Sequence, residues 1–179
     1  ARVAASAAFV LDGQAVRRIA PRDDRLGHGT RVTGILLGSA PQAQVLVAQV
    51  FRERLSTSAA QVAAAIDWAV LQGAQLVNLS LGLREPRPVL AAACARALDA
   101  GVVLCAAVPA IGPTVYPAGF TGVLRVTGDA RCAFGEIAAL GAVHADFGAH
   151  VRPIDGSLAG AGASMACAHL ASLAARHLA

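Results

Sequence analysis

The sequence contains no lysine, and its 15 basic residues are all arginine. Aromatic residues make up only 4% of the chain and charged residues only 15%. The net charge of +4 at pH 7 is small, and no dense run of basic residues occurs. Nucleic-acid-binding proteins usually concentrate basic charge on one face and offer aromatic rings on which bases stack. The composition therefore argues against nucleic acid as a partner.

Long uninterrupted apolar runs are also missing. A membrane-spanning helix needs about 20 consecutive apolar residues, and charged residues interrupt the longest apolar stretches of this chain. We therefore expect no membrane partner. Hydrophobic residues nevertheless amount to 56% of the total, which is typical of a globular chain with a buried core and not of a disordered one.

Cysteine is scarce and widely spaced. The four cysteines, Cys94, Cys105, Cys132 and Cys167, form no CxxC pair. Structural zinc sites are usually built from such closely spaced pairs, so we expect no metal and no other cofactor. Cys105 and Cys167 have alanine-rich, apolar neighbours, which is typical of small core residues. Reduced cysteines are typical of the cytoplasm, and no secretory cleavage pattern begins the sequence, so we expect a cytoplasmic protein.

Short β-branched runs alternate with longer alanine-rich segments along the chain. The sequence predicts strands over residues 3–11, 44–51, 76–81, 102–107 and 123–127. It predicts helices over residues 28–38, 58–72, 89–100 and 165–178, and a loop over 14–27. This alternation favours a mostly parallel sheet with helices on both faces. Because no repeat or second composition regime occurs, we predict a single α/β domain over residues 1–179.

Three reactive side chains occur at the ends of predicted elements, where parallel sheets collect their functional groups. Asp12 follows a predicted strand, His28 begins a helix within Gly-His-Gly-Thr, and Ser164 opens another within Gly-Ala-Ser-Met-Ala. A serine hydroxyl needs a base to become a nucleophile near neutral pH, and the base needs an acid to hold its tautomer. The three side chains supply these roles. The backbone N–H of Ser164 would also donate to an oxyanion at the positive end of its helix dipole.

In this order, the motifs resemble those of the subtilisin-like serine peptidases. Residues 27–34 resemble the histidine motif of that family, residues 76–82 its substrate-binding strand, and residues 162–169 its nucleophile motif. The resemblance runs through nearly the whole chain. It implies a minimal, divergent subtilisin-like fold whose catalytic triad is Asp12, His28 and Ser164.

The resemblance also implies where a peptide or protein substrate would bind. An extended substrate would pair with the backbone of Ser80, Leu81 and Gly82, which is binding by strand addition. Three further residues would bound the pocket for the side chain that precedes the cleaved bond: Ala106, Ala107 and Tyr116.

The chain departs from the family at several positions. Ala110, next to Pro109, stands where the family carries an oxyanion asparagine, and neither side chain can donate a hydrogen bond. Loss of one such donor typically lowers turnover by about 10²–10³-fold. Ala163 replaces the threonine that usually precedes the nucleophile, and Arg31 replaces a second histidine. The segment after the histidine helix is also too short for the calcium loop of the family, so we expect no calcium there.

The triad acid has two alternatives in the polar loop before His28, namely Asp23 and Asp24. Solvated charge is the simpler interpretation of both, so Asp12 is preferred.

Two functional hypotheses remain. The first is a serine endopeptidase with one narrow task, such as trimming the leader of a partner protein, because the triad is complete while the oxyanion site is poor. The second is a pseudo-peptidase that keeps the cleft and binds peptides without turnover. A flavodoxin-like nucleotide binder is set aside, because no phosphate-cradling glycine loop follows the first strand.

Overall fold

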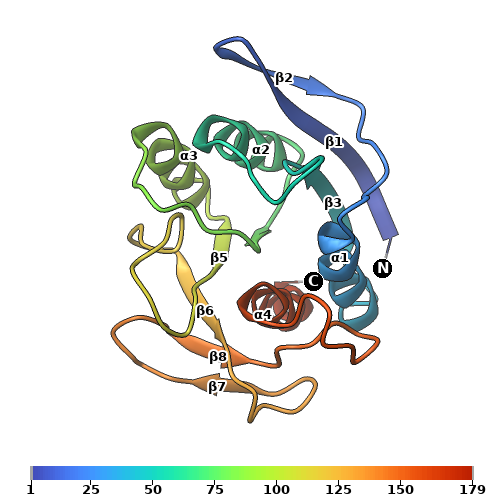
Figure 1. Cartoon of the computed structure of the whole chain (residues 1–179), viewed down its shortest axis with the longest axis vertical. Coiled ribbons are helices and arrows are strands. Elements are labelled where there is room, and N and C mark those ends of the chain that lie inside the picture. The colour runs from blue at the N-terminus through green and yellow to red at the C-terminus, as the bar shows by residue number, and fades with distance from the viewer. Residues whose placement is uncertain (1, 179) are drawn as a thin grey trace.

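The computed structural model describes residues 2–178 and contains eight strands and four helices (Figure 1). The strands are β1 (Arg2–Asp12), β2 (Ala15–Ile19), β3 (Gln44–Gln49), β4 (Leu76–Leu79), β5 (Val103–Ala107), β6 (Leu124–Gly128), β7 (Ile137–Ala139) and β8 (Phe147–Ala149). The helices are α1 (His28–Ser39), α2 (Ala59–Leu71), α3 (Pro88–Asp99) and α4 (Ala163–Leu178). Every predicted strand and helix is present, and three short strands, β2, β7 and β8, were not predicted. Between residues 2 and 178, no helix has the length and hydropathy that crossing a membrane requires.

The strands form two sheets in which most pairs are parallel. The first sheet has the order β2-β1-β3 and the second the order β4-β5-β6-β8-β7. β1 is parallel to β3 and antiparallel to β2, while the second sheet is parallel except for its edge strand β7. The prediction of an α/β fold with mainly parallel strands is therefore confirmed. The strands are divided between two sheets, however, and within the described part of the chain β3 and β4 are not paired.

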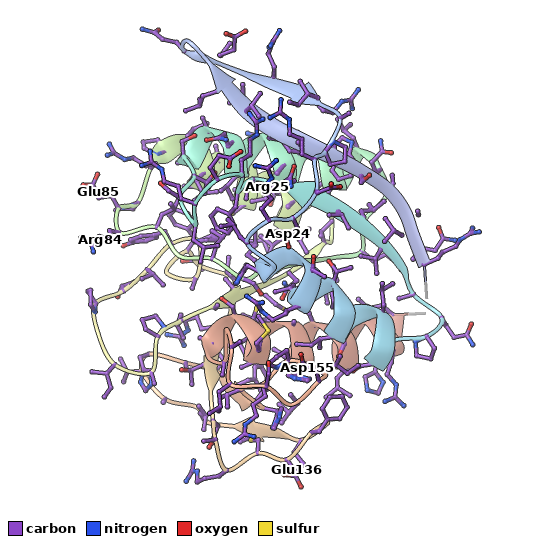
Figure 2. The ribbon with its side chains drawn as sticks, turned by 45° about the vertical axis from the view of Figure 1, so that its right-hand side comes forward. Asp24, Arg25, Arg84, Glu85, Glu136 and Asp155 are labelled. Atoms are coloured by element: carbon purple, nitrogen blue, oxygen red, sulfur yellow. The ribbon has the colours of Figure 1, made fainter. Side chains whose placement is uncertain are left out.

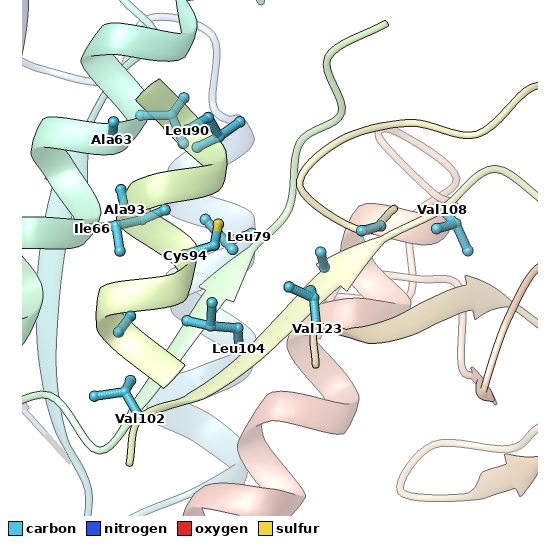
Figure 3. Close-up of a cluster of buried hydrophobic side chains, with 14 of the residues drawn as sticks. Ala63, Ile66, Leu79, Leu90, Ala93, Cys94, Val102, Leu104, Val108 and Val123 are labelled. Atoms are coloured by element: carbon cyan, nitrogen blue, oxygen red, sulfur yellow. The ribbon is translucent and has the colours of Figure 1, made fainter. Parts of the chain in front are cut away.

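β5 shows why helices cover both faces of the second sheet. Its sequence is apolar at every position, and successive side chains of a strand point to opposite faces. Leu104 and Ala106 pack against α2 and α3, whereas Cys105 and Ala107 pack against α4. Figure 3 shows the first of these two cores, in which Leu104 and Leu79 lie beside α3. The predicted arrangement of helices on both faces is thus confirmed.

α2 begins and ends where its local sequence favours a boundary. The Ser58 hydroxyl accepts a hydrogen bond from the backbone N–H of Gln61, whose side chain accepts one from the N–H of Ser58. This reciprocal pair is a capping box. Gly73, with a φ of +80°, adopts the left-handed conformation that commonly follows a helix. Trp68 of α2 contacts Phe9 of β1, with ring centroids 5.9 Å apart, and so packs the helix on the first sheet.

The first sheet corrects one prediction. Residues 14–27 are not all loop, because residues 15–19 form β2 and pair with the end of β1. Gly13, with a φ of +62°, permits the two-residue turn between the strands. Pairing of β1 with β3 stops at Ala8 and Gln49, while pairing with β2 continues to Asp12. The last part of β1 therefore leaves β3 and belongs to the hairpin.

All four cysteines are buried and unpaired. Burial raises the pKa of Cys94 to about 11 and that of Cys105 to about 12, so both thiols stay protonated at neutral pH. Cys105 and Cys167 are completely buried in the core between β5 and α4. The prediction that these two are core residues is confirmed.

Candidate active site

His28 and Ser164 meet at the backbone of Ser80. His28 is the first residue of α1, Ser164 lies in the first turn of α4, and Ser80 directly follows β4. His28 Nε2 lies 3.1 Å from the Ser80 carbonyl oxygen, and Ser164 Oγ donates to the same oxygen over 3.1 Å. The Ser80 hydroxyl in turn donates to the Ser164 carbonyl oxygen over 2.7 Å. Three residues that are far apart in the sequence thus form one cluster beyond the carboxyl end of a strand.

The ring of His28 faces a carbonyl oxygen, and not the Ser164 hydroxyl, with its Nε2 atom. A carbonyl oxygen only accepts hydrogen bonds, so the contact with Ser80 requires a hydrogen on Nε2. A histidine that activates a serine must instead accept the hydroxyl proton at Nε2. His28 Nε2 and Ser164 Oγ therefore share an acceptor and do not bond to each other. Moving the ring proton to Nδ1 would free Nε2 for Ser164.

Asp12 is not part of this cluster, which corrects the predicted triad. It lies at the end of the β1–β2 hairpin, where it pairs with Ala15, beyond the last residue of β1 that pairs with β3. Its carboxylate forms an ion pair of 2.9 Å with Arg17, and both side chains are exposed. Figure 1 shows the hairpin reaching away from α4, the helix that carries Ser164. Pairing with β2 thus carries Asp12 away from His28.

Asp24 holds the start of α1 and is not simply a solvated charge. Its Oδ1 accepts hydrogen bonds from the backbone of Leu26 and Gly27 over 3.2 and 2.9 Å. Its Oδ2 accepts from the backbone N–H and the hydroxyl of Thr30 over 2.8 and 2.9 Å. Figure 2 shows Asp24 at the beginning of α1. Partial burial acts to raise the pKa of Asp24, but the hydrogen bonds from Thr30, Gly27 and Leu26 outweigh it and hold the pKa below its usual value.

Asp24→Ala is expected to lower the free energy of unfolding by about 1 kcal/mol at pH 7, as loss of a helix cap does. Because the folded-state pKa is lowered, this stabilisation is present above the unfolded-state pKa of about 4 and is lost as the pH falls through the folded-state pKa. Urea denaturation at pH 7 and at successively lower pH should show the two unfolding curves converging in acid. Asp23→Ala is the matched control. Equal losses in both variants, or a difference independent of pH, would contradict the capping role.

A small cleft opens beside Ser164. It has a volume of about 240 Å³ and is lined by Leu81, Gly82, Ala107, Pro109, Val115 and residues 160–164. The Ser164 hydroxyl is the only polar side chain in this lining. Pro109 borders the cleft, and Ala110 is exposed beside it. A developing oxyanion would therefore find the backbone N–H of Ser164, in the first turn of α4, but no side-chain donor from the lining.

Only part of the predicted substrate pocket lines this cleft. Leu81, Gly82 and Ala107 do so. Ala106 is instead completely buried against α2 and α3, because neighbouring residues of a strand face opposite sides.

The structure places Val115 in the cleft wall, where the sequence suggested Tyr116. Tyr116 packs on Phe120, with ring centroids 4.9 Å apart, and its backbone pairs with that of Leu83. A Cβ atom at Gly82 would lie 3.1 Å from the Val115 side chain, so glycine permits this close approach. The local sequence contains no signal that would have identified Val115, and not Tyr116, as the residue that lines the cleft.

Two further histidines lie close together but are engaged elsewhere. The rings of His150 and His169 have centroids 5.3 Å apart. His150 Nδ1 lies 2.9 Å from the Cys132 carbonyl oxygen, and His169 Nε2 lies 2.8 Å from that of Arg152. Burial lowers the pKa of His169. No three His, Cys, Asp or Glu side chains gather as a metal-binding group between residues 2 and 178, so no metal site is assigned.

Comparison with known proteins identifies the family. Residues 9–179 match the model of the subtilase family. The thermostable alkaline protease of Halalkalibacterium halodurans is 32% identical over 136 residues, which are 70% of this chain and 36% of that protein. The chain therefore belongs to the subtilase family. It spans about a third of the length of this relative.

Solved structures share the fold. The S41 psychrophilic protease superposes with a TM-score of 0.70 at 24% identity, over 97% of this chain and 69% of that chain. The prenylagaramide maturation protease PagA superposes with a TM-score of 0.63 at 24% identity, over 83% of this chain and 62% of that chain. Both similarities confirm the predicted subtilisin-like fold.

Proposed function

We propose that the protein is a serine endopeptidase in which Ser164 is the nucleophile and His28 the general base and acid. The observation that carries this proposal is the meeting of both side chains at the Ser80 carbonyl oxygen. Ser164 Oγ attacks the scissile carbonyl carbon while His28 takes its proton and then passes it to the leaving amine. Water activated by His28 then hydrolyses the acyl-enzyme. Membership of the subtilase family supports this reaction class.

The substrate binds as an extended peptide along the segment that follows β4. Its backbone pairs with Ser80 to Gly82 by strand addition. The side chain before the cleaved bond enters the cleft beside Ser164, whose walls at Leu81, Ala107 and Val115 are apolar. A small apolar residue fits this cleft of about 240 Å³ best.

The task we propose is narrow, namely removal of a leader from one partner protein. The side chains that line the cleft include no hydrogen-bond donor for the oxyanion, since the one polar side chain, Ser164, is the nucleophile. Turnover is therefore expected to be about 10²–10³-fold lower than in a site that has such a donor. Such a rate suits a single processing event better than general digestion. PagA, a neighbour in fold, is a maturation protease by its name. The four free cysteines fit a reducing, cytoplasmic location for such processing.

Peptide binding without turnover is the second candidate function. The observation that favours it is the contact between His28 Nε2 and the Ser80 carbonyl oxygen, which takes the place of a contact with Ser164 Oγ. Among residues 2–178, no carboxylate forms a hydrogen bond or an ion pair with the His28 ring.

Treatment with a fluorophosphonate followed by intact-mass analysis separates the two candidates. One adduct on the wild type, and none on Ser164→Ala or His28→Ala, is the expected result, because the reagent needs an activated serine. Circular dichroism of the variants controls for folding. No adduct on the wild type would favour the binding function. Rapid digestion of casein would contradict the narrow task.

A further inference from the structure

Arg31 is a cation that lies close to the reactive pair without an acid to neutralise it. It stands three residues after His28 in α1 and is half-buried. Within residues 2–178 its guanidinium donates one hydrogen bond, from Nη2 to the Leu26 carbonyl oxygen over 3.4 Å, while Nε is buried without a partner. None of the ion pairs in the same part of the chain includes Arg31. Because charged groups that leave water are normally paired, this guanidinium lacks a partner.

Two carboxylates in the neighbourhood are engaged with other groups. The hydrogen bonds of Asp24 all come from the start of α1. Asp155 Oδ1 accepts a hydrogen bond from the backbone N–H of Ser157 over 2.9 Å. Hydrogen bonds from Ser157 hold the pKa of Asp155 below its usual value, and the positive charge of Arg31 lowers this pKa further. Arg31 and Asp155 thus sense each other's charge without forming an ion pair, which leaves the guanidinium available to a carboxylate of another molecule.

Two glycines make room for the guanidinium. A Cβ atom at Gly27 would lie 2.9 Å from Arg31 Nη1, and one at Gly160 would lie 2.8 Å from Nε. Both glycines have a positive φ, of +67° and +76°, which a residue with a side chain rarely adopts. Gly27 directly precedes His28, and Gly160 lines the cleft beside Ser164. The guanidinium therefore lies between the segments that lead into the base and into the nucleophile.

The segment that contains Gly160 is held against α1. Ile154 packs on Gly38 near the end of this helix, where a Cβ atom would meet the Ile154 side chain. The backbone N–H of Gly162 donates to the Val151 carbonyl oxygen over 2.8 Å and closes the segment. An incoming carboxylate would thus meet a guanidinium that is already in place, which lowers the entropic cost of binding.

The general acid decides which part of the substrate lies near Arg31. In the proposed reaction His28 passes its proton to the leaving amine, so the residue after the cleaved bond begins beside His28. Side chains three positions apart on a helix are neighbours, with about 5–6 Å between their Cβ atoms. Arg31 is therefore within reach of the first side chain of the leaving segment. The residues before the cleaved bond lie elsewhere, along residues 80–82 and in the cleft.

We infer that Arg31 is a specificity-determining residue that binds the carboxylate of an aspartate or glutamate placed directly after the cleaved bond. The inference rests on the proposed function and narrows its substrates to proteins with an acidic residue at that position. A guanidinium presents its N–H groups as a planar fork, which matches the two oxygens of a carboxylate. Such a pair would satisfy the buried Nε–H or the free N–H groups of Nη1 and Nη2.

A matched pair of peptides tests this preference. The probe is Val-Ala-Val-Ala-Glu-Ser-Gly, amidated and carrying a neutral dye at its amino end, so that glutamate supplies its only carboxylate. The small alanine before the glutamate suits the apolar cleft. The control peptide has glutamine in place of glutamate. Hydrogen bonds to charged groups are worth enough that we expect the Glu peptide to bind about 10-fold or more tightly than the Gln peptide.

Binding and cleavage have separate readouts. Fluorescence anisotropy with the Ser164→Ala variant measures affinity in the absence of cleavage. Mass spectrometry of a mixture of both peptides, treated with the wild type, gives the ratio of their kcat/KM values. Both ratios should favour the Glu peptide, and 1 M salt should reduce the preference, because it screens exposed charges.

Substitutions of Arg31 assign the preference to this side chain. Arg31→Ala should bring the Glu-to-Gln ratio close to one, and Arg31→Lys, which keeps the charge but not the fork, should retain part of it. Arg31→Glu should favour a peptide with lysine at the same position. Arg25→Ala is the matched control, because Arg25 is an exposed arginine of the same region, and its ratio should equal that of the unchanged chain. Circular dichroism checks the folding of each variant.

The other outcomes separate the specificity from the peptidase. Equal affinities for the Glu and Gln peptides, or binding of neither, would overturn the inference without any need for a variant. A Glu preference that persists in Arg31→Ala would show that another cation binds the acid. Cleavage of both peptides at equal rates would refute the specificity and leave the peptidase standing. Conversely, a Glu preference in binding that requires Arg31, without cleavage by the wild type, would support the specificity and refute the peptidase.

Discussion

His28→Ala, Ser164→Ala and the double variant are expected to cleave a peptide ester at the same residual rate. Ser164 and His28 meet at one carbonyl oxygen and act as one unit, so removing either partner removes the function of both. In subtilisin, a member of the same family, either single loss lowers kcat by about 2 × 10⁶-fold, while loss of the acid lowers it by about 3 × 10⁴-fold. Because no carboxylate partners the His28 ring among residues 2–178, the expected loss is at least roughly 50-fold.

Initial rates on a peptide ester, measured for all three variants, test this expectation. His144→Ala is the control, because His144 is exposed and lines a different cavity. Its rate should equal that of the wild type. If the double variant were slower than either single variant by a further large factor, the two side chains would contribute independently, and the assignment of a nucleophile–base pair would fail.

The order of the elements could be predicted because each one has a local sequence signal. The apolar run of β5 has no polar alternation, and the capping box of Ser58 and Gln61 begins α2. β2 was missed because its sequence, Ala-Val-Arg-Arg-Ile, is short and half polar. The two short strands β7 and β8 are only three residues each, which is too few for a period of two to be recognised.

The nucleophile and base could be predicted because glycine fixes their local geometry. Gly27, before His28, has a φ of +67°, and Gly162, before Ala163 and Ser164, has a φ of +142°. A residue with a side chain rarely adopts such conformations. These motifs therefore carry structural information within a few residues, and the structure brings the two of them together.

The acid could not be predicted because its place depends on strand pairing, which is not local. Asp12 follows an apolar strand, as a triad acid would. The end of β1 nevertheless pairs with β2 in a hairpin, where Asp12 forms an ion pair with Arg17. The sequence likewise does not predict that β3 and β4 are unpaired, because both strands have the continuous apolar runs that are typical of strands inside a sheet. The role of Asp24 could have been predicted, because an aspartate just before the start of a helix commonly accepts hydrogen bonds from the free N–H groups of the first turn.

Ala110→Asn is expected to raise kcat by about 10²–10³-fold, the reverse of the loss that follows removal of an oxyanion donor. Ala110 is exposed next to Pro109, which lines the cleft beside Ser164, so an amide side chain there has room and displaces no core residue. It would add a donor to a cleft whose only polar side chain is the nucleophile. We expect kcat to rise while KM stays unchanged, because the charge on the oxygen develops only in the transition state.

Steady-state rates on a peptide ester measure this gain, and Ile111→Asn is the matched control, since that neighbouring side chain is 92% exposed. An equal gain in both variants, or none in Ala110→Asn, would show that residue 110 does not face the oxyanion.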